Sequence, residues 1–323
     1  MKHRSVQYNC IIPGTEATRP CRDSELDGTV VQPTCQRPHY YTPLELPYMT
    51  CAQGRWNAWP TCIPECGLLS SEVSSGTSTS TRVPWHAAIF SKNITAATHE
   101  HICSGSLISN SVVLSAAHCF WSDSSKALKE ETNFAVAVGK LYSSWSHHDD
   151  EQYVQRSDVK KIVVPKGYRG ADGDDLAVVV VSQAFEYQLH VRPICLDFKR
   201  DLFDRQLVVG NHGKSAGWSV PTNEVSSTKA LQVIDMPFVS NGDCVTKSSV
   251  GDKLCAGNVN GPGLCDTDSG SGLVFSATLQ NTTRYYLRGV VTTRLSTSEA
   301  CNSFTTFTSI MKYQKLIKTY WFL

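Results

Sequence analysis

The thirteen cysteines of this 323-residue chain are the feature that most limits how it can fold. Five of them fall within the first 65 residues, and the other eight are spread through the rest of the chain. Such a density is typical of a disulfide framework formed in an oxidising compartment, and small domains with small cores need these cross-links. The sequence therefore predicts a secreted, extracellular protein with a small disulfide-rich module at its N-terminus.

The first ten residues and the net charge indicate what precedes the chain and what it binds. The opening MKHRSVQYNC has no apolar stretch of a secretory signal, and the cysteine count is odd. We therefore expect a piece of a longer secreted protein. The formal net charge of +1 gives no reason to expect nucleic acid. The longest apolar run, LAVVVV, is too short for a membrane span, and no pattern points to a cofactor.

Composition divides the chain into three parts. Residues 1–65 are rich in cysteine and proline, residues 66–82 form a serine- and threonine-rich linker, and residues 83–323 contain many short β-branched runs between turn residues. Many short strands of this kind predict a barrel or a sandwich. The tail IMKYQKLIKTYWFL has apolar residues at helical spacing and predicts a closing helix.

Three residues offer the groups that acyl transfer to water requires. LSAAHC supplies His118 as a base, GDDLAVVVV supplies Asp175 as a carboxylate, and DSG supplies Ser269 as a nucleophile. Each alone has an ordinary interpretation: a core or surface histidine, an aspartate at a strand end, and a serine in a turn. All three together, in this order, favour a catalytic set.

Three further stretches, PWHAAI, VRPICL and SAGW, accompany that set, and residues 66–323 resemble the chymotrypsin-like serine proteases. The resemblance implies an all-β fold, a chymotrypsin-like double β-barrel with a C-terminal helix. It implies that His118, Asp175 and Ser269 are the catalytic triad of a serine endopeptidase. The oxyanion hole would be made by the backbone N–H groups of Thr267 and Ser269.

The end of the first part, CAQGRWNAWPTC, resembles the last strand of a complement control (sushi) module. This resemblance implies disulfides Cys10–Cys51 and Cys35–Cys62 and leaves Cys21 over; a sushi-like variant with one more disulfide is the alternative. The resemblance to the proteases implies four more disulfides: Cys66–Cys195, Cys103–Cys119, Cys244–Cys255 and Cys265–Cys301.

Thr267 departs from the protease pattern, because the family has glycine at this position. Glycine is usual there since the active loop has a positive φ, which a β-branched residue rarely adopts. We expect strain of about 1–3 kcal/mol, while outright loss of one oxyanion donor costs about 10²–10³ in rate. The sequence thus predicts a slow protease; the alternative is a small shift of the loop without functional effect.

The residues expected in the specificity pocket also differ from those of trypsin. Gly263 stands where trypsin-like enzymes place an aspartate, so a basic P1 side chain would meet no counter-charge. Thr292 supplies a hydroxyl beside Asp175, and Thr305 replaces a glycine near the pocket base. Arg294, at the rim, either receives an acidic P1 residue or is a solvated arginine. The resemblance therefore implies a shallow, elastase-like pocket for a small or acidic P1 residue.

Activation in the family requires a cut before an apolar residue, whose new ammonium group pairs with the aspartate before the nucleophile, here Asp268. No lysine or arginine lies between Cys66 and Arg82, so a trypsin-like convertase cannot cut there. The expected bond joins Glu72 to Val73, with the bond after Leu69 as the second choice. A non-basic activation bond beside a pocket without an acid suggests that the enzyme cuts itself.

The loop GKLYSSWSHHDDEQ occupies the place that holds calcium in some members of the family. Lys140 stands where they have a glutamate, so its ammonium group is expected to pair with Asp149, Asp150 or Glu151. His147 and His148 could bind a metal, but an exposed polar loop is favoured, and no metal site is predicted.

Two Asn-X-Thr sequons, at Asn93 and Asn281, are expected glycosylation sites if the protein is secreted.

The layout of a sushi-like module before such a protease domain resembles the modular serine proteases that start insect immune cascades, and also the horseshoe-crab endotoxin-sensing factor. This implies a self-activating zymogen in the hemolymph, clustered by an upstream pattern-recognition complex. Its substrate would be the zymogen of a downstream clip-domain serine protease in Toll and melanisation responses. A catalytically silent homologue acting as a scaffold, and a general elastase, are the alternatives.

Overall fold

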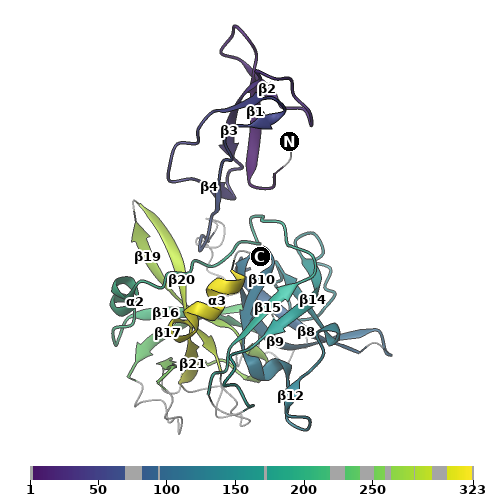
Figure 1. Cartoon of the computed structure of the whole chain (residues 1–323). Coiled ribbons are helices and arrows are strands. Elements are labelled where there is room, and N and C mark those ends of the chain that lie inside the picture. Colours follow the sequence, from purple (N-terminus) through teal and green to yellow (C-terminus); the bar gives the residue numbers. More distant parts are fainter. Residues whose placement is uncertain are drawn as a thin grey trace. The chain divides into compact units, whose positions relative to one another are not determined.

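The computed structural model describes residues 3–69, 82–93, 95–170, 173–218, 230–240, 251–258, 263–279, 281–292 and 304–321. The chain forms two compact units, residues 1–65 and 66–323. Figure 1 shows both units coloured along the sequence. None of the helices in the described ranges combines the length and the apolar composition that crossing a membrane requires.

The N-terminal unit is built from short strands. A five-stranded antiparallel sheet has the order β2-β1-β3-β5-β6, and β4 pairs with β7. Cys10, Val31 and Met49 are fully buried at its centre. The strands are β1 (Val6–Ile11), β2 (Thr18–Pro20), β3 (Val30–Cys35), β4 (Tyr40–Tyr41), β5 (Met49–Ala52), β6 (Arg55–Trp56) and β7 (Ile63–Pro64).

The disulfides of this unit correct one expectation. Cys35 is bonded to Cys62, as the sushi resemblance implies, but Cys10 is bonded to Cys21, and Cys51 is a buried free thiol. The expected Cys10–Cys51 pair is therefore wrong. The sheet order gives the reason: β1 lies beside β2, which leads directly to Cys21, whereas β3 separates β1 from the strand that carries Cys51.

The second unit consists of two closed six-stranded barrels, the blue-to-teal and the green-to-yellow parts of Figure 1. The first has the order β10-β15-β14-β13-β8-β9 and the second β16-β17-β18-β21-β20-β19. The expected all-β, chymotrypsin-like double barrel is confirmed. The first barrel contains β8 (His86–Asn93), β9 (Thr98–Ser109), β10 (Val112–Ser115), β13 (Phe134–Val138), β14 (Gln155–Val163) and β15 (Ala177–Val181). The second contains β16 (His212–Gly217), β17 (Gln232–Val239), β18 (Lys253–Ala256), β19 (Gly272–Leu279), β20 (Thr282–Val291) and β21 (Thr305–Ser309).

The apolar runs of the sequence form the interior of the two barrels. β15 is buried along its whole length, because β10 and β14 flank it and its valines fill the core. The second barrel closes over a cluster that includes Met236, Leu273 and Phe307. The minor elements are strands β11 (Trp121–Ser122) and β12 (Ala127–Leu128), and 3₁₀ turns η1 (Ala117–Phe120), η2 (Glu131–Asn133) and η3 (Asp266–Asp268).

The expected closing helix is present as η5 (Ile310–Tyr313) followed by α3 (Gln314–Tyr320). After it, the Trp321 indole donates to the Ile108 carbonyl at 3.0 Å, so the chain returns to the first barrel. A second helix, α2 (Arg200–Gln206), was not expected. Its buried Gln206 accepts a hydrogen bond of 2.6 Å from the fully buried Arg288.

Cys66 is held on the second unit by more than its disulfide to Cys195. The Arg284 guanidinium donates to the Cys66 carbonyl at 2.9 Å. The Gly67 N–H donates to the Pro193 carbonyl, and the Gly67 carbonyl accepts from the Tyr285 N–H, each at 2.8 Å. A Cβ at this glycine would collide with the Tyr285 backbone. A cut after this point in the linker would thus leave residues 66 and 67 attached.

We expect disulfide mapping to find Cys10 linked to Cys21 and to find Cys51 alkylated only after unfolding. The Cys51 side chain is 4% exposed, so a reagent cannot reach its sulfur in the folded unit. Peptide mass spectrometry after alkylation, with and without denaturant, makes the measurement. A peptide that links Cys10 to Cys51 would contradict the pairing described here.

Candidate active site

The structure brings His118 and Asp175 into direct contact. The His118 Nδ1 atom lies 2.8 Å from Asp175 Oδ2, and the His118 backbone N–H donates to Oδ1 at 2.9 Å. His118 belongs to η1, which follows β10, and Asp175 lies just before β15. Because β10 and β15 are neighbours in the first barrel, their ends bring the imidazole and the carboxylate together.

The second barrel contributes a third hydrogen bond to this carboxylate. The Thr292 hydroxyl, directly after β20, donates to Asp175 Oδ2 at 2.5 Å. Burial opposes ionisation of Asp175, but the hydrogen bonds from His118 and Thr292 outweigh it and hold the pKa of this carboxyl below its ordinary value. The carboxylate therefore stays charged and fixes the imidazole with Nδ1 as the donor.

The Ser269 loop is attached to β9 of the first barrel. Ser269 is 1% exposed, and its carbonyl accepts a hydrogen bond of 2.8 Å from the Ser104 backbone. Ser104 follows Cys103 on β9, and Cys103 is disulfide-bonded to Cys119, the neighbour of His118. Gly270 has φ +90°, and a Cβ there would collide with Ser104 O and Ser115 Oγ, so only glycine fits.

Thr267 does not have the conformation expected for it. It lies in η3, where the Asp268 N–H donates to the Cys265 carbonyl at 2.9 Å, and it is not among the described residues with positive φ. A turn closed by this bond is of type I when its third residue has negative φ and of type II when that φ is positive. Thr267 thus avoids the expected strain by taking the type I form, because its Cβ disfavours the other.

The two forms of the turn differ in the peptide between Asp266 and Thr267. In going from type I to type II, ψ of the second residue changes from about −30° to about +120°, which reverses the direction of that peptide. The Thr267 N–H, one of the two expected oxyanion donors, therefore points to opposite sides in the two forms.

Asp268, the expected partner of a new N-terminus, is fully buried. Its carboxylate accepts hydrogen bonds from the Trp218 N–H at 2.8 Å and from the Cys265 N–H at 3.3 Å. Glu72 and Val73, the residues of the expected activation bond, lie outside the described ranges.

Two of the residues expected in the pocket, Gly263 and Thr305, are both buried. Leu264, which sequence reasoning missed, is 1% exposed and packs in the core cluster of the second barrel with Phe307. No local pattern in the sequence signals this burial. None of these three side chains carries a charge, while Arg294 lies outside the described residues.

Two of the four disulfides that the protease resemblance implies lie wholly within the described residues. Cys66–Cys195 and Cys103–Cys119 are the pairs that the protease resemblance implies. Cys255 and Cys265 are each in a disulfide. Their expected partners, Cys244 and Cys301, lie outside the described residues.

Lys140 pairs with Asp150 rather than with Asp149 or Glu151. Its Nζ atom lies 3.1 Å from Asp150 Oδ2, and both side chains are almost completely buried. The same carboxylate accepts the backbone N–H groups of Leu141 and Tyr142. The ammonium group therefore neutralises the inside of this loop, as the sequence predicts.

Both predicted sequon asparagines are exposed. Asn93 ends β8, and Asn281 lies at the tip of the β19–β20 hairpin with φ +61°. Glycosylation of these side chains stays a prediction.

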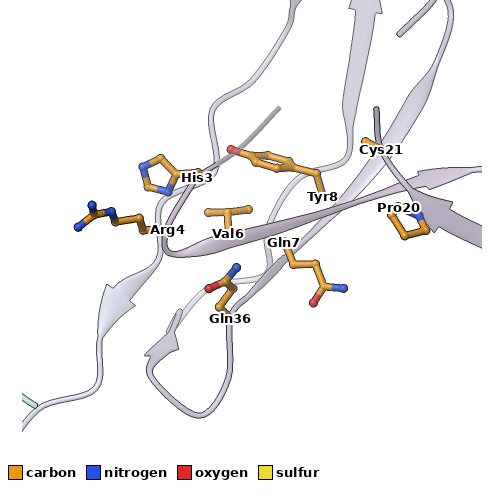
Figure 2. Close-up of a pocket in the computed structure, with 8 residues that line it drawn as sticks. All are labelled: His3, Arg4, Val6, Gln7, Tyr8, Pro20, Cys21 and Gln36. Carbon is orange, nitrogen blue, oxygen red and sulfur yellow. The ribbon is translucent and has the colours of Figure 1, made fainter. Parts of the chain in front are cut away.

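The N-terminal unit has a cavity of about 390 Å³, which Figure 2 shows. His3, Arg4 and Tyr8 contribute polar groups to its lining. The lining contains no carboxylate, and its one cysteine, Cys21, is in a disulfide. This cavity lacks a hydrolytic set of the kind that His118 and Asp175 form.

Comparison with known proteins adds to this geometry. The family model described as Trypsin matches residues 73–317. The modular serine protease of Drosophila melanogaster is 28% identical over 309 residues, which are 90% of this chain and 48% of that protein. Clotting factor C of Tachypleus tridentatus is 29% identical over 80% of this chain and 26% of its own length. The inactive CLIP domain-containing serine protease A8 of Anopheles gambiae is 28% identical over 66% of this chain and 58% of that protein. The chain thus spans about half, or less, of the first two relatives.

We expect Thr292→Val to slow ester hydrolysis by about 5- to 150-fold, since removing one hydrogen bond from a buried carboxylate costs about 1–3 kcal/mol. The Thr292 hydrogen bond lowers the pKa of Asp175, so its loss raises that pKa. The ionised form is the one that holds His118, and the low-pH limb of the rate profile therefore moves to higher pH.

The matched control is Thr278→Val, which removes an exposed hydroxyl that hydrogen-bonds to the Thr283 hydroxyl at 2.9 Å. Steady-state rates between pH 4 and pH 9 would be measured for both variants. An unchanged profile for Thr292→Val would contradict the role of this hydroxyl.

Proposed function

Because this chain belongs to the trypsin family of serine proteases, we propose that it is the zymogen of a secreted serine endopeptidase with His118, Asp175 and Ser269 as its triad. The observation that carries this is the Asp175 carboxylate, which accepts hydrogen bonds from His118 Nδ1 and from Thr292. In this arrangement Nε2 of His118 is the atom left to take a proton.

The mechanism follows from those contacts. Ser269 Oγ attacks the carbonyl carbon of the scissile peptide while His118 takes its proton, and the imidazolium is stabilised by Asp175. His118 then gives the proton to the leaving amine as the C–N bond breaks. Water repeats the sequence on the acyl-serine and releases the acid. The backbone N–H groups of Ser269 and Thr267 would stabilise the oxyanion in both steps.

The turn at Thr267 supports the proposal that the zymogen has low activity. In its type I form the Thr267 N–H points away from the direction that a type II turn would give it. Activation would cut the bond between Glu72 and Val73, or the one after Leu69, and the new ammonium group would pair with the buried Asp268. That ion pair would offset the strain that positive φ causes at Thr267.

The buried residues near the expected pocket support a small or acidic P1 residue. Gly263, Leu264 and Thr305 provide no negative charge for a lysine or arginine. Arg294 is the proposed partner of an acidic P1 side chain. Glu72, before the proposed activation bond, is such a residue, which favours self-cleavage.

The role in a cascade rests on the relatives and on the N-terminal unit. One relative is named a modular serine protease and another a clotting factor. We propose that this protein, in hemolymph, is clustered by an upstream pattern-recognition complex. It would then cleave a clip-domain protease zymogen that leads to Toll and melanisation responses.

A second candidate is a catalytically silent scaffold, since one relative is named inactive. Against it stands the complete set of His118, Asp175 and Ser269 in this chain. Active-site titration with a serine-directed phosphonate separates the two: labelling of Ser269 after cleavage requires a working triad.

We expect self-cleavage in the linker at high protein concentration, because weakly active molecules then meet often enough to cut each other. The measurement is N-terminal sequencing of fragments from purified protein at increasing concentration. A new N-terminus at Val73 would identify Glu72 as P1.

Ser269→Ala is the control and should remain intact at every concentration. A cut that also occurs in Ser269→Ala would contradict self-cleavage. Unchanged cutting after Glu72 in Arg294→Gly would contradict the role of that arginine while leaving self-cleavage in place.

We expect Thr267→Gly to raise kcat on a small peptide substrate by about 5- to 150-fold, because glycine removes about 1–3 kcal/mol of strain from the active turn. The comparison uses cleaved protein of each variant, normalised by active-site titration. An equal or lower kcat for the glycine variant would show that Thr267 does not limit the oxyanion hole.

A further inference from the structure

His147, His148 and Asp149 form a cluster of metal-ligating side chains in the loop between β13 and β14. Their ligand atoms all lie within 4.8 Å of one another. In the described part of the chain, two other such clusters occur, but both depend on cysteines that are already in disulfides. Those sulfurs cannot act as thiolate ligands, so among these clusters the one at residues 147–149 is the one whose ligand atoms are not held in a disulfide.

We propose that His147, His148 and Asp149 bind a divalent transition-metal ion, with Zn²⁺ as the best match. Two imidazole nitrogens and one carboxylate oxygen are a common zinc donor set, and water completes the tetrahedron when the protein supplies three ligands. Calcium prefers six to eight oxygen ligands, which this cluster does not offer.

The backbone turn sets the spacing of the three side chains. The Asp150 N–H donates to the His147 carbonyl at 3.0 Å, which places His148 and Asp149 in the centre of a tight turn. The Asp149 carboxylate then lies between the two rings: Oδ1 is 2.7 Å from His148 Nε2, and Oδ2 is 3.9 Å from His147 Nδ1. Donor atoms of a tetrahedral zinc site are about 3.4 Å apart, given bonds of about 2.0–2.2 Å. The two distances lie on either side of that value, so small side-chain rotations admit the ion.

His147 is held ready for coordination. Its ring stacks on Tyr142 at 3.7 Å between centroids, and its side chain is 16% exposed. The Asp149 N–H lies 3.4 Å from His147 Nδ1, which makes this nitrogen the acceptor. The lone pair of this nitrogen is the one that a metal ligand needs, so a bound ion would replace this long hydrogen bond.

The proposed site is separate from the buried charge pair of the same loop. Asp150 points inward to Lys140 and is already satisfied by that ammonium group, by the Arg82 guanidinium at 3.2 Å and by two backbone N–H groups. Arg82 contacts the Asp149 main chain, where its guanidinium donates to the carbonyl at 2.6 Å. The Asp149 carboxylate therefore remains for an ion, and the ion would stiffen a turn that also holds Arg82.

The test uses the full chain without a histidine tag, in the Ser269→Ala background, so neither readout depends on proteolysis. Isothermal titration with ZnCl₂ should show a site that His147→Asn/His148→Asn loses, with binding weakened by about tenfold or more. His99→Asn is the matched control, because His99 stacks on Trp145 outside the cluster and its loss should leave the site intact. Asp149→Asn should weaken the same site without removing an imidazole.

Thermal unfolding supplies the second readout. Zn²⁺ should raise Tm in the Ser269→Ala protein and in His99→Asn, but not in the double histidine variant, since only a ligand bound to the folded state stabilises it. Equal zinc stoichiometry and affinity in the double variant would overturn the proposal. So would a site that takes CaCl₂ in preference to ZnCl₂.

Discussion

The buried carboxylate of Asp175 is the group on which the second unit's arrangement depends. It is 3% exposed, and a charge so far from water is costly unless hydrogen bonds satisfy it. Its donors come from η1 through His118 and from the end of β20 through Thr292. One belongs to the first barrel and the other to the second. The carboxylate is therefore fully satisfied only when both barrels are folded and packed together, which ties the site to the assembly of the unit.

The C-terminal elements contact Asp174, the residue directly before Asp175. Asp174 has φ +55°, a conformation that aspartate tolerates better than most side chains. Lys312 and Tyr313 of η5 donate to its carboxylate at 2.9 and 2.6 Å. Because Asp174 is fixed in this way, the backbone delivers Asp175 to His118 in one orientation. The closing helix thus positions a site residue far from it in sequence.

The parts of this structure that the sequence predicts are those set by local patterns. The apolar run of β15 and the residues around His118, Asp175 and Ser269 each carry their own signal, and so does the spacing of the closing helix. The partner of Cys10 has no such signal, because it depends on which strand lies beside β1. Helix α2 has only seven residues, too few for a clear period. Leu264 was missed because its burial follows from the closure of the second barrel, not from its neighbours.

Thr267 shows how one side chain can set the balance between two forms of a loop. The bond from the Asp268 N–H to the Cys265 carbonyl is compatible with both turn types, so the change needs only a local peptide reversal. Glycine would make the two forms similar in energy, whereas threonine favours type I by about 1–3 kcal/mol. That free-energy difference reduces the population of the type II form by about 5- to 150-fold. The ion pair proposed at the buried Asp268 would favour the type II form of the same turn. The population of that form would then depend on the difference between the free energy of this ion pair and the strain at Thr267.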